Sequence, residues 1–409
     1  MKIELVVMTS LLLFGLLGVS CTPGRDFNTR LVSVVKPYRF YIAQWELSTI
    51  FHEAKQFIFD RNKKVDNDIN KVNEYFAIVD QLKTLKTEIE AIKTGNKQGD
   101  LAALEAEFAE LQQKRAALDN VVEKTVATQI RETLNKQDIF NPIEKYIKLK
   151  FNFPPIDFKL DKPPHLLVVS PRDRIESIRE VVLLQELSVE EMESIEDEVD
   201  ELGVSSLVVT LGGFGGTYPT FVTNEASLRF TVDAAVEEWL HHYLSFRPLG
   251  FRYLLDLIGV SRDYEIAIMN ETVASMVGKE IGATLSEKYY PESVNKDNQP
   301  QETASGFDFN REMREIRKAV DEYLARGEIE QAEEFMEQKR QFLVSQGYYF
   351  RKLNQAYFAF HGTYADRPTS ISPIGVELKK LREQSTSLKE FLETVASMTS
   401  RQDLLTSLK

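Results

Sequence analysis

Apolar residues recur every three or four positions along residues 65–130, the spacing of helices with one apolar face. They form two stripes. The first stripe consists of Val65, Ile69, Val72, Phe76, Val79, Leu82, Leu85, Ile89 and Ile92, and the second of Leu101, Leu104, Phe108, Leu111, Leu118 and Val122. The polar segment 94–100 between them holds two glycines and ends in Asp100, which can cap the next helix. We therefore predict an antiparallel coiled-coil hairpin, which acts as a spacer or packing arm or binds a partner protein.

Two proline pairs interrupt the pattern after the hairpin, at 154–155 and 163–164. Proline lacks the amide donor that a helix needs, so we expect a new domain to begin near residue 151. The apolar, β-branched runs 166–169 and 206–210 predict short buried strands.

An acidic helix is predicted between these strands. Ser188 and Glu191 form a capping box at its start, and Glu and Asp residues continue to Glu201. We expect this run of charges to face solvent.

Four glycines follow the second predicted strand, at 212, 213, 215 and 216. Their spacing fits neither a dinucleotide fingerprint nor a P-loop. Glycines allow a strand edge or loop to approach another group closely. In a peptidase that group would be a substrate backbone, and a structural turn is an equally good interpretation.

The N-terminal apolar run 5–19 is shorter than the roughly 20 residues of a membrane-spanning helix, and it suits a signal peptide over residues 1–20. It ends in Leu-Gly-Val-Ser-Cys, which resembles a lipobox, and Cys21 is the only cysteine in the chain. We expect lipidation of Cys21 and an extracytoplasmic lipoprotein held at a bacterial membrane by its lipid anchor. Plain secretion with an incidental cysteine is the alternative.

Net charge and histidine content limit the possible functions. A formal charge of -13 argues against a nucleic-acid partner, because phosphates require a concentrated basic face. Any metal site must draw on few imidazoles, because the chain has only five histidines. These are His52, His165, His241, His242 and His361.

The most informative polar pattern is Glu-Glu-Trp-Leu-His-His at 237–242. On a helix, residues four apart share a face, so Glu237 and His241 project together and Glu238 lies beside them. Metallopeptidases use this arrangement as His-Glu-x-x-His, in which the outer residues hold zinc and the Glu activates water. Here Glu occupies the first position. His242 lies about 100° further around the helix, so we expect it to pack rather than to bind metal.

A second match is Asn-Glu-Thr-Val-Ala at 270–274, within a segment of helical spacing. It resembles the helix from which zincins of the gluzincin branch take their third ligand, where the small Ala permits close packing on the first helix. Glu271 would fill the ligand position.

A third match is the late segment 351–364. Together the three segments resemble a family of bacterial aminopeptidases, many of them lipoproteins, which pair an active-site helix and an Asn-Glu helix with a late Asn/Gly/Tyr region. The resemblance covers roughly residues 205–400, and the first two motifs are the specific ones. Either His361 or Tyr364 could stabilise the oxyanion that forms when water attacks a peptide carbonyl.

Carried over residue by residue, the resemblance implies that Glu238 is the general base and that His241 and Glu271 are metal ligands. Glu237 stands where a His ligand is expected, which weakens the case for full zinc affinity and activity. The expected cofactor is Zn²⁺ or another divalent metal, and the expected substrate is a peptide or protein.

Other interpretations stay open. His241 can be a satisfied core histidine and Glu271 an ordinary carboxylate, and the protein is then an inactive zincin-like lipoprotein that acts as an envelope scaffold or binding module. A di-iron bundle needs two Glu-x-x-His pairs. No histidine other than His241 has a Glu three residues before it, so that alternative is excluded.

The sequence thus predicts a mainly α protein. A signal peptide (1–20) and a helical hairpin region (21–150) precede a zincin-like metallopeptidase domain with a few strands (151–409). That domain should end in helices around residues 315–346 and 375–398. The expected function is peptide hydrolysis by metal-activated water.

Overall fold

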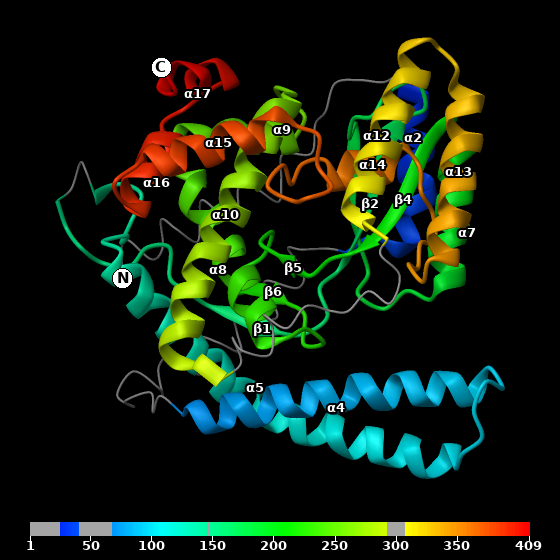
Figure 1. Ribbon diagram of the computed structural model, residues 1–409, viewed down its shortest axis with the longest axis horizontal. Helices are drawn as coiled ribbons and strands as arrows, with labels where there is room; N and C mark the ends of the chain where they lie inside the picture. Colours follow the sequence, from blue (N-terminus) through cyan, green and yellow to red (C-terminus); the bar gives the residue numbers. More distant parts are fainter. Residues whose placement is uncertain (1–24, 41–67, 145–147, 293–306) are drawn as a thin grey trace.

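The computed structural model describes residues 25–40, 68–144, 148–292 and 307–409 (Figure 1). The predicted signal peptide, Cys21 and His52 lie outside these ranges. The described chain is mainly helical with a few short strands, as predicted. None of its described helices combines the length and apolar character needed to cross a membrane.

Two long helices, α4 (Ile69–Lys93) and α5 (Leu101–Lys136), run side by side in opposite directions and extend to one side of the molecule (Figure 1). The predicted cap is confirmed, because the side chain of Asp100 accepts a hydrogen bond from the amide of Ala103 at 3.1 Å. Only the second half of α5 is buried, from Val122 onward. That half shares one apolar core with the helices that carry the predicted site.

The larger sheet has the strand order β3-β2-β4 and is antiparallel throughout. Its strands are β2 (His165–Pro171), β3 (Arg179–Leu183) and β4 (Val204–Thr210). Helices α2 (Arg25–Val35) and α7 (Val189–Asp200) share a core with one face of this sheet. The strands predicted at 166–169 and 206–210 are therefore confirmed.

A smaller sheet has the order β1-β6-β5, with β1 (Phe158–Leu160), β5 (Gly213–Phe214) and β6 (Thr220–Val222). Strand β6 pairs parallel with β1 and antiparallel with β5. The glycine-rich segment thus supplies the β5 edge of this sheet.

The centre of the molecule holds α8 (Leu228–Ser245) and α10 (Tyr264–Tyr289), with the shorter α9 (Pro248–Leu257) between them in sequence (Figure 1). Glycines allow α8 and α10 to approach closely. A Cβ atom on Gly278 would lie 2.8 Å from the carbonyl oxygen of Asp233. Backbone therefore packs against backbone where these helices meet.

The remaining helices surround this pair. Helices α12 (Phe309–Ala325) and α13 (Ile329–Ser345) form a second hairpin that shares a core with α14 (Gln355–His361). The remaining elements after α14 are α15 (Pro373–Gln384), α16 (Leu388–Ala396) and α17 (Arg401–Ser407), and a short 3-10 turn, η1 (Lys36–Tyr38), follows α2.

The acidic helix α7 has its predicted capping box at Ser188 and Glu191. The expectation that its charges all face solvent is wrong at Glu196, which is fully buried. Both guanidinium NH groups of Arg351 donate to its carboxylate at 2.6 Å, and the amide of Val208 donates at 2.6 Å. Glu196 therefore joins α7 to β4 and to the segment before α14.

Candidate metal centre

Helix α8 places Glu237 and His241 on one face, one turn apart, and α10 brings Glu271 to the same place. Each of the three side chains offers one ligand atom, and these atoms all lie within 4.8 Å of one another. His241 Nε2 and Glu271 Oε2 lie 3.7 Å apart. Ligand atoms around a tetrahedral zinc at about 2.0–2.2 Å would lie about 3.3–3.6 Å apart, so this pair suits a common cation.

Asn270 orients the imidazole of His241. Its Oδ1 lies 2.8 Å from His241 Nδ1, and an amide oxygen only accepts, so Nδ1 carries the proton and donates. The lone pair of His241 is then on Nε2, the atom that faces Glu271. Metal-binding histidines are commonly oriented in this way by a partner on the other ring nitrogen.

Tyr253 of α9 holds Glu271 in place. Its hydroxyl donates to Glu271 Oε1 at 2.5 Å, and its ring centre lies 5.9 Å from that of His241. The sequence did not predict this residue, because nothing around Tyr253 carries a motif and its partner is 18 positions away.

Burial raises the pKa of Glu237 to about 8, and the negative charge of Glu271 adds to the effect. Glu271 is buried and Glu237 is half-buried, so little water screens their charges. With Glu238 beside them, three carboxyl groups share this small volume. A divalent cation would supply the missing positive charge, and the donor set of one imidazole and two carboxylates fits such an ion.

Glu238 lies against the glycine-rich edge. A Cβ atom on Gly213 would come within 2.5 Å of Glu238 Oε1, and one on Gly215 within 2.6 Å of Oε2. The close approach expected of these glycines is therefore an approach to Glu238. Burial raises the pKa of Glu238 well above its ordinary value, and the negative charges of Glu237 and Glu271 raise it further.

His242 faces the same edge and not the group of Glu237, His241 and Glu271, as expected from its position on the helix. Its Nε2 donates to the carbonyl oxygen of Gly215 at 2.6 Å, and burial lowers its pKa to about 4. A neutral His242 thus fixes the β5 edge over α8.

Tyr364 and His361 differ in their surroundings. Burial raises the pKa of Tyr364 well above its ordinary value, and the charges of Glu271, Glu237 and Glu238 add to this, so Tyr364 lies within electrostatic reach of these carboxyl groups. His361 instead packs on Tyr357, with ring centres 4.3 Å apart, and burial lowers its pKa to about 4. The structure brings Tyr364 to the cluster and leaves His361 among aromatic rings.

The loop that carries Tyr364 is tied to α10 directly beside Glu271. Thr272 donates its hydroxyl to the carbonyl oxygen of Thr363 at 3.2 Å and accepts from the amide of Ala365 at 2.9 Å. The positions of Glu271 and Tyr364 are therefore coupled through one side chain.

Comparisons with models of protein families, with curated protein sequences and with solved structures found no match to this chain.

Proposed function

We propose that this protein is a metal-dependent peptidase with a zincin-like domain. The single observation that carries the proposal is the group of Glu237, His241 and Glu271, whose ligand atoms lie within 4.8 Å of one another on two closely packed helices. A bound divalent cation would act as a Lewis acid and promote ionisation of a water molecule.

The residues of the chain have distinct roles in this proposal. Glu238 accepts the proton of the attacking water and passes it to the leaving amine, a role that suits a carboxyl group whose pKa is raised by burial. The Tyr364 hydroxyl donates a hydrogen bond to the oxyanion that forms on the peptide carbonyl. Tyr253 and Asn270 position Glu271 and His241.

Loading with zinc or manganese, followed by elemental analysis, tests the proposal. About one ion per chain should bind, and His241→Ala should abolish binding. Glu238→Gln should keep the metal and lose hydrolysis of a mixed peptide library, because an amide cannot accept the proton. Binding of no metal above background would refute the proposal.

A second candidate function rests on Glu237, which occupies the position where the resembled family has a His ligand. In this alternative the centre is inactive, and the α4–α5 arm acts as a coiled-coil scaffold or partner-binding module at the envelope. This alternative would be favoured if the protein bound neither zinc nor manganese and hydrolysed no peptide of the library.

We also propose that the mature protein begins at an acylated Cys21, on the strength of the apolar run that ends there. Mass spectrometry of the membrane fraction should detect the lipid, and Cys21→Ser should release the protein from the membrane. A wild type without lipid would refute this part.

A further inference from the structure

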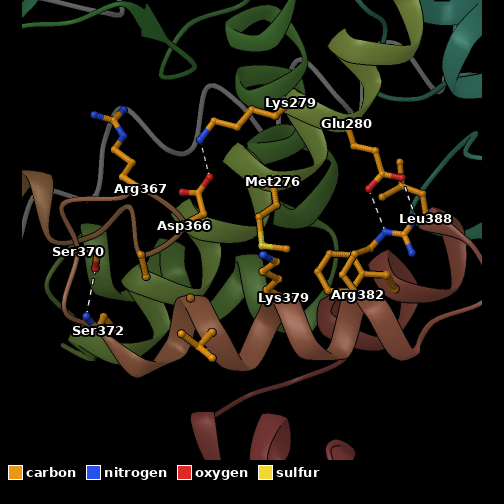
Figure 2. Close-up of a pocket in the computed structure, with 14 residues that line it drawn as sticks. Met276, Lys279, Glu280, Asp366, Arg367, Ser370, Ser372, Lys379, Arg382 and Leu388 are labelled. Carbon is orange, nitrogen blue, oxygen red and sulfur yellow. Dashed lines mark hydrogen bonds and ion pairs between the residues drawn. The ribbon is translucent and has the colours of Figure 1, made fainter. Parts of the chain in front are cut away.

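A pocket of about 540 Å³ lies between α10, α15 and the loop that follows Tyr364 (Figure 2). Side chains of Met276, Leu388 and Phe391 supply its apolar lining. The N-cap residue Ser372 and three residues of α15, Gly375, Val376 and Lys379, also line it. The volume is that of a site for a side chain or a small molecule.

Positive charge predominates around this pocket, although the chain as a whole carries a charge of -13. Four cationic side chains and two carboxylates line it. These are Lys279, Arg367, Lys379 and Arg382, with Asp366 and Glu280. The excess of two positive charges marks the pocket as a site for an anion.

Two of the four cations already have partners. Lys279 Nζ lies 2.5 Å from Asp366 Oδ2, and Arg382 donates to both oxygens of Glu280 at 2.9 and 2.7 Å (Figure 2). Arg367 and Lys379 form no ion pair with any residue that the structure describes. Arg367 packs on the ring of Tyr364 and is directed away from Lys379 (Figure 2). Lys379 is therefore the side chain available to an incoming anion.

Asp366 offers a further unsatisfied polar atom at the same place. Its Oδ2 accepts from Ser275 at 3.0 Å and from Lys279, and the side chain is only 10% exposed. Its buried Oδ1 has no hydrogen-bond partner in the described structure.

The pocket adjoins the proposed metal centre. Glu271, Ser275 and Lys279 follow one another at steps of four residues on one face of α10, so Lys279 lies about 12 Å along the helix from Glu271. The guanidinium of Arg367 lies 4.2 Å from the ring centre of Tyr364. An extended peptide advances about 3.3 Å per residue, so a substrate held at the centre could reach the pocket with its third or fourth residue.

We propose that this pocket binds a carboxylate of the peptide substrate through Lys379, with a neighbouring apolar group of the substrate on Met276 and Val376. The inference rests on the proposed peptidase function and names its substrate class, short peptides that carry a carboxylate three or four residues from the scissile bond. The carboxylate is either the C-terminal one or that of an acidic side chain.

Calorimetric titration of metal-free protein with defined peptides tests this pocket separately from catalysis. The probes are Ala-Ala-Ala-Leu as the free acid and as the C-terminal amide, and the amides of Ala-Ala-Ala-Glu and Ala-Ala-Ala-Gln. The wild type should bind a carboxylate probe about tenfold more tightly than its uncharged partner. A preference within the Leu pair assigns the C-terminal carboxylate, and one within the Glu/Gln pair assigns a side chain.

Lys379→Glu should reduce the preference to less than about twofold by reversing the charge at the pocket. Lys380→Glu is the matched control, because Lys380 is the next residue on α15, is exposed and does not line the pocket. It should keep the preference. Equal binding of charged and uncharged probes by the wild type, or a preference that survives Lys379→Glu, would overturn the inference.

The outcome for the pocket is distinguishable from that for the centre. If the protein binds carboxylate probes preferentially but never binds metal, the pocket proposal is supported and the peptidase proposal is refuted. Metal-dependent hydrolysis with no preference for a carboxylate would do the reverse.

Discussion

The hydroxyl of Tyr253 donates to Oε1 of Glu271 at 2.5 Å, and the other carboxylate oxygen, Oε2, lies 3.7 Å from His241 Nε2. Tyr253 thus fixes one oxygen of Glu271 and leaves the second directed at the imidazole. The orientation of Glu271 depends on a residue of α9 that is not among the three candidate ligands.

Tyr253→Phe should weaken zinc binding about tenfold, because loss of a partner that orients a ligand usually costs ten- to a hundredfold in affinity. Competition with a chromophoric chelator measures the affinity. Tyr349→Phe is a matched control, since Tyr349 is 96% exposed, and it should bind zinc as the wild type does. Equal affinity in the two variants would contradict the orienting role of Tyr253.

Glu237→His should tighten zinc binding at pH 7 by about tenfold. With a pKa of about 8, Glu237 must lose a proton to bind a cation, and one pKa unit corresponds to about 1.4 kcal/mol. An imidazole is also a softer ligand, so manganese should gain less than zinc. Glu237→Gln, which removes the charge without offering a good ligand, should bind both ions more weakly. A His variant with no gain would show that residue 237 does not face the metal.

Gly215→Ala should impair hydrolysis while the metal stays bound. The added Cβ would come within 2.6 Å of Glu238 Oε2, so the carboxylate must move, and a displacement of about 1 Å at a catalytic group can cost about a hundredfold in rate. Gly99→Ala in the α4–α5 turn meets only the tip of the Ile92 side chain and serves as the control. The measurements are kcat and metal content. A variant that loses its metal together with its activity, or one that keeps full activity, would contradict the assignment of Glu238 as the base.

Asp119→Asn should stabilise the protein at neutral pH. Burial raises the pKa of Asp119 from an ordinary value of 3.8 to about 6 in the folded state, and the negative charge of Glu123 is the second cause. The folded state therefore binds the proton more tightly, and its stability falls as the pH rises from about 4 through 6.

The expected gain in the free energy of unfolding at pH 7 is about 1 kcal/mol, less than the full pKa difference implies, because solvent screens a half-buried group. At pH 4 the gain should vanish. Urea denaturation at both pH values measures it, with Asp80→Asn on the exposed face of α4 as the control. A gain that is equal at the two pH values would reject the assignment.

Local patterns predicted the helices well. The apolar spacing of 65–130 and the cap at Asp100 are properties of neighbouring residues, and they anticipated α4 and α5 to within a few positions, apart from residues 65–67, which lie outside the described ranges. The helices predicted around residues 315–346 are α12 and α13, and they are separated at Gly327, which takes a positive φ of 75°. The domain boundary near residue 151 stays a prediction.

The candidate site was predictable where its residues share one helix. Glu237, Glu238 and His241 follow from helical periodicity, whereas the contact of Glu238 with Gly213 and Gly215 depends on how a strand edge folds over α8. The same limit applies to Glu196 and Arg351, which are 155 positions apart. A charge in an acidic run resembles its solvated neighbours until its distant partner is known.

The close contact of α8 and α10 at Gly278 determines how the centre would respond to its ion. Two helices that touch through their backbones, with His241 and Glu271 already fixed by Asn270 and Tyr253, would form a preassembled site for the proposed ion. These side chains would then be ordered on folding, before the proposed ion binds. A chelator should therefore strip the ion and leave the tertiary structure intact, unlike a zinc finger, which unfolds when its metal is removed.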